Sequence, residues 1–248
     1  MISLPRLIPL LLLAALPCSA DALADLRGTL LKLQGAEAIH AKADIQNWSQ
    51  EGEGKKARIK QTHSTVQLED GPNGLRLGWT SAQIQGARME SQLKAVNPEA
   101  VTPNLDSLSA LTGLNATAFL SQSDQLLQQL KGATLLEEKP DAYQGNPARL
   151  VVFKLDPAVS ADEKSLIKDR KETLKVWLDA HGVPLATEHA IAIKASKFLI
   201  SFTANNRQAR KLAVLGNRLV VSSETQENSG SGMGFTNTSK KVTALSFY

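Results

Sequence analysis

The sequence predicts an α+β fold in which a large curved antiparallel sheet, a half-open β-barrel, carries helices on one face as a lid. Three observations lead to this prediction. Segments in which apolar and polar residues alternate lie on both sides of a helical block at about residues 81–132. Turn signals link successive strands closely enough for antiparallel pairing. About ten strands exceed what a twisted open sheet comfortably carries, so we expect strong curling around a cavity.

The first twenty residues have the pattern of a secretory signal peptide. Arg6 precedes the apolar run Leu7–Leu16, and small residues follow for cleavage after Ala20. The run is too short for a helix that spans a bilayer core, which needs about 20 residues. We therefore expect residues 1–20 to be removed and the mature protein to be periplasmic.

The composition excludes several classes of protein. The chain has 28 Lys and Arg against 24 Asp and Glu in 248 residues, too even a balance for a nucleic-acid-binding surface. The single cysteine, Cys18, lies in the expected signal segment, so the mature chain has no disulfide and no cysteine metal site. Pro17 directly before Cys18 argues against a lipid anchor there. Residues 21–248 are predicted to form one domain and to be monomeric.

The mature chain begins with a predicted amphipathic helix and a meander of strands. Leucines recur at helical spacing over residues 21–34, and alternation then predicts strands at 39–50, 57–68 and 75–80. The block 81–132 is predicted to be helical, with its clearest helix from Asn115 to Lys131 and Gly132 as the stop signal.

Seven further strands are predicted after this block. Turn residues at Asp179–Gly182 and Ala204–Arg207 predict hairpins, Asn228–Gly234 is predicted to be a flexible loop, and the charged stretch Pro157–Lys171 is predicted to be a loop with a helical turn. The predicted strands are Thr134–Lys139, Ala148–Leu155, Leu174–Asp179, Pro184–Ile193, Lys197–Thr203, Lys211–Gln226 and Lys240–Phe247.

Signals for catalysis or for a cofactor are missing from the sequence. It contains no Gly-x-Ser-x-Gly, no His-Glu-x-x-His and no glycine-rich phosphate loop between a strand and a helix. His40 and His63 fall on neighbouring predicted strands and could face one another, but two ligands are too few for a structural zinc site. We expect no enzyme activity, no cofactor and no metal.

The segment Lys164–Lys175 is the strongest charged feature. Its cations could contact anionic head groups at a membrane surface. Neighbouring carboxylates, such as Asp162 and Glu172, favour instead an ordinary solvated loop. Both interpretations stay open from the sequence.

Three segments resemble the outer-membrane lipoprotein sorting carriers, the LolA/LolB-like proteins. They are Tyr143–Leu155, Leu174–Leu185 and Gly216–Val220, and the second contains the hairpin pattern Trp-x-Asp-x-x-Gly-x-Pro from Trp177 to Pro184. The resemblance implies a curved sheet, lidded by helices, that holds acyl chains in a hydrophobic cavity. The long helical block and the basic segment depart from the family's pattern.

The resulting functional prediction is a periplasmic protein that binds or carries an acyl-chain ligand, either a lipid or a lipidated protein. Each buried methylene contributes roughly 0.8 kcal/mol, so one acyl chain supplies a usable affinity without a catalytic group. A protein-interaction or stress-sensing module on the same sheet is the alternative, and an unrecognised hydrolase is the third. The candidate cavity liners are Ile45, Ile59, Val66, Leu75, Leu77, Val152, Val176, Ile191, Leu199 and Val220.

Overall fold

The computed structural model describes residues 22–54, 57–156, 166–197 and 200–248. The expected signal peptide and the candidate liner Leu199 lie outside these residues. In the part of the chain described here, no helix is long and apolar enough to cross a membrane.

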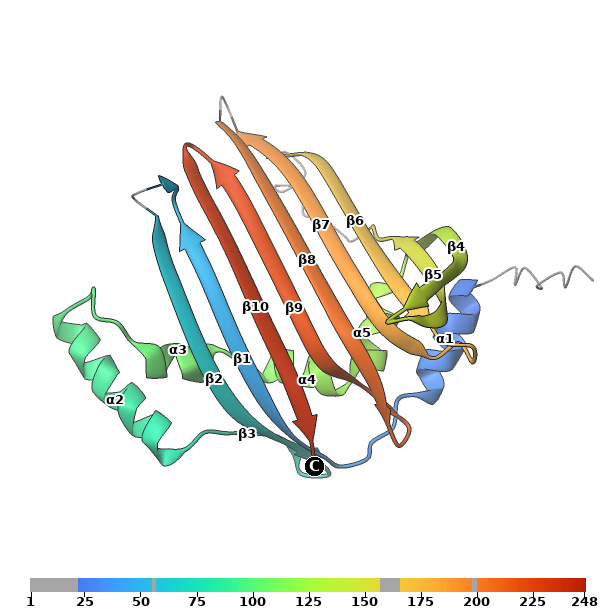
Figure 1. Cartoon of the computed structure of the whole chain (residues 1–248), viewed down its shortest axis with the longest axis horizontal. Coiled ribbons are helices and arrows are strands. Elements are labelled where there is room, and N and C mark those ends of the chain that lie inside the picture. Colours follow the sequence, from blue (N-terminus) through green and yellow to red (C-terminus); the bar gives the residue numbers. More distant parts are fainter. Residues whose placement is uncertain (1–21, 55–56, 157–165, 198–199) are drawn as a thin grey trace, which may run out of the picture.

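All ten strands belong to one open antiparallel sheet, in the order β3-β2-β1-β10-β9-β8-β7-β6-β5-β4 (Figure 1). Strand β10 pairs with β1, so the end of the chain joins its two strand-forming regions. The strands are β1 Ile39–Glu51, β2 Arg58–Gly71, β3 Gly74–Gly78, β4 Thr134–Tyr143, β5 Asn146–Lys154, β6 Ile167–Leu178, β7 Pro184–Lys197, β8 Ile200–Leu215, β9 Arg218–Gly232 and β10 Phe235–Phe247. The α+β class and the large antiparallel sheet are therefore confirmed, and the sheet is not closed.

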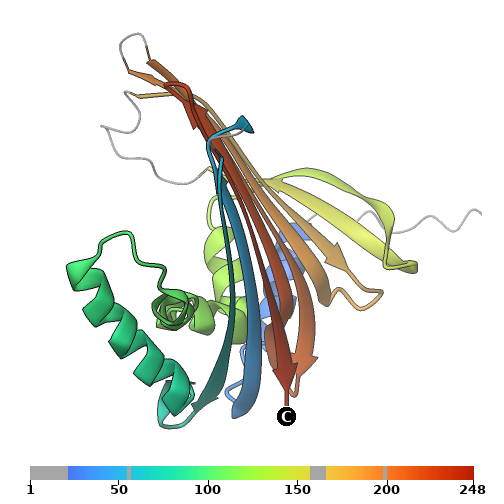
Figure 2. The same cartoon turned by 60° about the vertical axis from the view of Figure 1, so that its left-hand side comes forward.

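Five helices accompany the sheet. They are α1 Ala22–Lys32, α2 Ser81–Val96, α3 Pro103–Ser109, α4 Gly113–Leu120 and α5 Gln122–Gln129. Helices α3, α4, α5 and α1 cross one end of the strands, whereas α2 packs on α3 at the side (Figures 1 and 2). We call the side of the sheet that the helices cover the helix face and the other side the open face. The distal end is the end that carries the β7–β8 and β9–β10 turns.

Two hydrophobic cores fill the space between the helices and the sheet. In one core, Phe119 and Leu120 of α4 pack on β1 and β2 residues such as Ile45 and Val66. In the other, Leu26 and Leu30 of α1 join α5 over strands β5 and β6. Alternation explains the sidedness of the strands, since every second residue of β1 from Ile39 to Ile45 is buried.

The predicted helix 115–131 is interrupted, because Ser121 ends α4 and begins α5. The cause lies in the sheet. The buried guanidinium of Arg218 donates to the Leu120 carbonyl oxygen at 2.7 Å and to the Ser121 hydroxyl at 3.2 Å. The Leu120 carbonyl oxygen therefore has a hydrogen-bond donor without the backbone N–H group that a continuing helix would supply. The hydrophobic stripe does not reveal this break.

After residue 133 the chain forms strands, as predicted, but several strand ends and turns lie at other residues than predicted. The Asp179–Gly182 turn is confirmed. Ala204–Arg207, predicted as a turn, lies inside β8, and the predicted loop Asn228–Gly234 is mostly paired strand with its turn at Met233-Gly234. The predicted strand Lys211–Gln226 is broken by a turn at Gly216-Asn217.

Candidate functional site

The distal half of the helix face is left uncovered by the helices (Figure 2). Strands β7, β8, β9 and β10 extend past α4 and α5 there, and no helix of the described residues covers them on this face. Below this region the helices pack on the sheet through the two cores. The open distal surface is the part of this face that a ligand can reach without displacing a helix.

A groove of about 390 Å³ lies in this region. Two cross-strand rows form its helix-face floor: Ile191–Asn206–Asn228 and, one step further out, Ile193–Ala204–Gly230–Asn237. Gly230 and Ala204 leave the centre of the floor low, since neither has a long side chain. We call these residues the distal groove; its lining is Ile191, Ile193, Ala204, Asn205, Asn206, Asn228, Ser229, Gly230 and Asn237.

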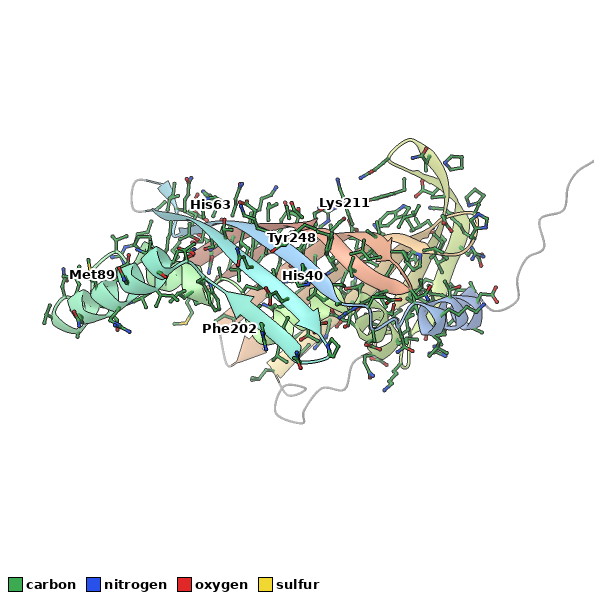
Figure 3. The ribbon with its side chains drawn as sticks, turned by 90° about the horizontal axis from the view of Figure 1, so that it is seen from below. His40, His63, Met89, Phe202, Lys211 and Tyr248 are labelled. Carbon is green, nitrogen blue, oxygen red and sulfur yellow. The ribbon has the colours of Figure 1, made fainter. Side chains whose placement is uncertain are left out.

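Two aromatic rings stand at the outer end of the distal groove. Phe202 and Phe235 both pair with Gly232, one from each side, and are 41% and 53% exposed. A Cβ on Gly232 would lie 2.4 Å from the Phe202 ring. The ring can pack over this position because glycine has no side chain. Figure 3 shows Phe202 on the opposite side of the sheet from His63 and Lys211.

An amide row borders the groove on the side of the helices. Asn206 donates to the Oδ1 atom of Asn228, and Asn228 donates to the Ser239 hydroxyl at 3.1 Å. The amides thus satisfy one another across three strands, which holds their side chains flat on the sheet. The site has apolar residues at its distal end and amides at its inner end.

A charged cluster flanks the groove on β6 and β7. The nearly buried Glu172 carboxylate accepts from Arg170 at 2.6 Å and contacts His189 Nε2 at 2.8 Å. Both partners lie on the same face as Ile191, which pairs directly with Glu172. The charged side chains of this cluster lie beside the groove, and the residues that line the groove are uncharged.

No protein family matches the chain, and no curated protein matches its sequence. The resemblance to the lipoprotein sorting carriers therefore rests on the residues that suggested it.

The structure does not bring the predicted cavity liners together at one site. Among the candidate liners that the structure describes, Ile191 alone lines the distal groove. Ile45, Val66 and Val220 are buried in the core under α4, with Leu75 and Leu77 packed against them, and Val176 is buried under α1 and α5. Ile59 and Val152 alternate with helix-face residues and lie on the open face, where Ile59 is 60% exposed.

The histidines do not assemble a site for metal or for nucleophilic catalysis. His40 pairs with Glu69, whereas His63 pairs with Gln46 and binds Asp44 at 2.7 Å, so the two rings do not face one another (Figure 3). No group of three or more possible metal ligands occurs among the described residues. His189 contacts Glu172, and within the same residues no hydroxyl is hydrogen bonded to its ring.

The basic segment is also different from its predicted form. From Ile167 onward it is strand β6, so alternation divides its cations between the two faces. Arg170 pairs with Glu172 on the helix face, and Lys175 pairs with Glu188 at 2.9 Å on the open face. Lys164 lies outside the described residues.

Sequence reasoning missed the residues that make the distal groove. Asn205 and Asn206 were assigned to a turn, and Gly230 and Gly232 to a flexible loop, because these residue types usually break strands. The alternation of Phe202, Ala204 and Asn206 with polar residues on the other face was the available signal.

Proposed function

We propose that this chain is a non-catalytic envelope protein that binds an amphipathic acyl-chain ligand, a lipid or a lipidated protein, on the distal half of its helix face. The observation that carries the proposal is the pair of exposed rings, Phe202 and Phe235, at the end of a groove whose floor combines apolar residues with amides. Large apolar side chains that share an exposed sheet face mark binding surfaces more often than isolated ones do.

The groove suits a ligand with one apolar and one polar end. Ile193, Phe202 and Phe235 would cover the chain, while the amide row at Asn206 and Asn228 would meet its ester or amide groups. At about 390 Å³ the groove lies at the lower end of the range usual for ligand sites, roughly 300–1,000 Å³. It therefore fits part of an acyl chain, with the remainder of the ligand outside.

A fluorescent C16 fatty acid titrated into the mature protein tests the proposal. Replacing both rings, Phe202→Ser and Phe235→Ser, should weaken binding at least tenfold, because roughly 1.5–3 kcal/mol of burial is lost for each ring. Both side chains are exposed, so the fold should keep its circular dichroism spectrum. The matched control is Tyr248→Ser, which removes an exposed ring at the other end of β10 and should leave the affinity unchanged.

Native mass spectrometry of protein isolated from its own envelope supplies the second measurement. A bound mass with acyl-chain fragments supports the proposal. The proposal is contradicted if the isolated protein has no bound mass and also does not bind the fatty acid in the titration. That result would favour the protein-interaction module. For that alternative the available surface is the edge of β2, which β3 covers only at Gln67–Gly71.

A further inference from the structure

A second groove, of about 500 Å³, lies mainly on the open face of the same strands. Its axis follows β7. Ala192 lies between Lys171 of β6 and Asn205 of β8, and Ala190 lies between Thr173 and Arg207. The two alanines form a low floor, and the longer side chains of β6 and β8 form the walls. We call this the open-face groove.

A ladder of ion pairs crosses five strands at one end of this groove. Glu188 on β7 accepts from Lys175 at 2.9 Å and from Arg207 at 2.5 Å. Glu227 on β9 in turn contacts Arg207 at 3.3 Å and Lys240 at 3.1 Å. Three cations therefore share two carboxylates, and the ladder carries one net positive charge.

Further positive charge lies along the walls of the groove. Lys171 lines it and forms no ion pair within the described residues, and Lys194 lies two residues beyond Ala192 on the floor strand, opposite Asp169 of β6. Each carboxylate of the ladder is already bound by two cations, so neither offers a free site for another cation. The local potential is therefore positive, which favours an anionic ligand.

The neutral groups of the groove are donors for an oxyanion. Thr173 and Ser229 present hydroxyls, and Asn205 presents an amide beside Ser229. Arg207 uses its Nε, Nη1 and Nη2 atoms on the two glutamates, but a guanidinium has five N–H donors. Donors of this kind around a lysine match the oxygens of a phosphate group.

We propose that the open-face groove binds a phosphate ester, with the phosphate between Lys171 and Arg207 and the esterified alcohol over Ala190 and Ala192. The low floor admits a small polyol or sugar alcohol, and Asn205 and Ser229 are placed to bind its hydroxyls. The groove lies mainly on the opposite face from the distal groove, although Ile191, Asn205, Asn206 and Ser229 line both. The two proposals are tested with different probes and different variants, so each can fail without the other.

Glycerol 1-phosphate is the probe for a direct test by NMR titration of the mature protein. Saturable shifts of the amides of Lys171, Thr173, Ala190, Ala192 and Arg207 are expected, with none for glycerol alone. Lys171→Glu should weaken binding by about tenfold or more, because it replaces an attraction to the phosphate by a repulsion. Lys211→Glu makes the same charge change on the same face outside the groove and should leave the affinity within twofold (Figure 3).

Vesicles distinguish a free ester from a lipid headgroup. Sedimentation with phosphatidylglycerol vesicles, lost in Lys171→Glu and absent with phosphatidylcholine, would identify the headgroup as the source. Binding of the soluble ester without vesicle binding would identify a free phosphate ester. The proposal is overturned if glycerol 1-phosphate does not bind, if it binds Lys171→Glu as it binds the unchanged protein, or if its shifts fall outside the groove.

Discussion

Three cationic side chains explain how short helices are stable on this sheet. Each donates to a carbonyl oxygen at the C-terminal end of a different helix: Lys241 to Ala110 after α3, Arg218 to Leu120 in α4, and Arg27 to Leu130 after α5. The last carbonyls of a helix have no partner within it, and a cation there also meets the negative end of the helix dipole. Burial lowers the pKa of Lys241, whose contact with Ala110 is only 2.6 Å.

Arg218 is predicted to be the most sensitive of these residues. Arg218→Ala removes the donor to Leu120, the hydrogen bond to the Glu37 carbonyl and the partner of the Asp70 carboxylate. Breaking a buried ion pair from one side costs about 3–5 kcal/mol, and the partial exposure of Asp70 puts the expected loss near 2–3 kcal/mol. Urea unfolding measures it. Lys139→Ala breaks an exposed pair and should cost far less; equal losses for the two variants would contradict the assignment.

At the scale of the elements, two hairpin turns contain residues that do not favour the backbone conformation of the turn. Two hairpins have a non-glycine residue at positive φ before a glycine: Gln144-Gly145 in the β4–β5 turn and Met233-Gly234 in the β9–β10 turn. Both central residues at positive φ are the mark of a type I′ turn, in which Asn-Gly is strongly preferred. Glutamine and methionine fit this conformation less well, since their side chains meet the backbone there.

Gln144→Asn should therefore stabilise the protein by about 0.5–1 kcal/mol. The substitution lies far from both grooves, so ligand binding should not change. Thermal unfolding of the variant against the parent chain measures the effect. Gln144→Val is the opposite control, because a β-branched residue at positive φ should lower the stability. A neutral result for both would mean that the turn does not hold this conformation.

The sequence predicted elements well where the residue pattern and the local preference agreed, and failed where they conflicted. In β1, alternation from Ile39 to Ile45 predicted both the strand and its buried face correctly. In β8, Asn205 and Asn206 prefer turns, but pairing on both sides keeps them in the strand, and Asn206 finds its partner in Asn228. That partner lies on another strand, so no local signal contains it.

The same reason limits what could be predicted of the candidate site. Ile191 was identified as a ligand contact because it is apolar on a strand, a property it shares with core residues such as Ile45 and Val66. The difference between them is whether a helix covers the strand at that level. This depends on where α4 and α5 end over the sheet, which follows from long-range contacts such as those of Arg218 and Arg210.

At the scale of the whole molecule, the two faces of the sheet are stabilised in different ways. The helix face has two apolar cores and a buried ion pair, Arg210 and Glu224, 2.7 Å apart, in which Arg210 also donates to Gln122 and Gln125 of α5. The open face has the ion-pair ladder from Lys175 to Lys240. Strands β6 to β10 are thus linked by buried apolar side chains and buried ion pairs on the helix face, and by a more exposed ion-pair ladder on the open face.

The ladder predicts how stability depends on pH. Burial raises the pKa of Glu188, but the hydrogen bonds from Lys175 and Arg207 outweigh it and hold the pKa below its usual range. The hydrogen bond from Lys240 lowers the pKa of Glu227 in the same direction. A carboxyl whose pKa is lower in the folded protein stabilises it above the unfolded pKa, about 4.3, and the contribution is lost as the pH falls through the folded value.

The double variant Glu188→Gln and Glu227→Gln should therefore be less stable than the parent at pH 7, by about 1–2 kcal/mol after allowing for the solvent exposure of Glu227. The difference should shrink as the pH falls from 7 to 3, because the stabilisation is lost as the carboxyls of the parent take up protons. Urea unfolding at the two pH values measures it, and Glu69→Gln, an exposed glutamate on the same face without an ion pair among the described residues, is the control expected to change nothing. A deficit that stays constant from pH 7 to pH 3 would show that the two glutamates act through packing, and the open face would then owe its stability to its backbone pairing alone.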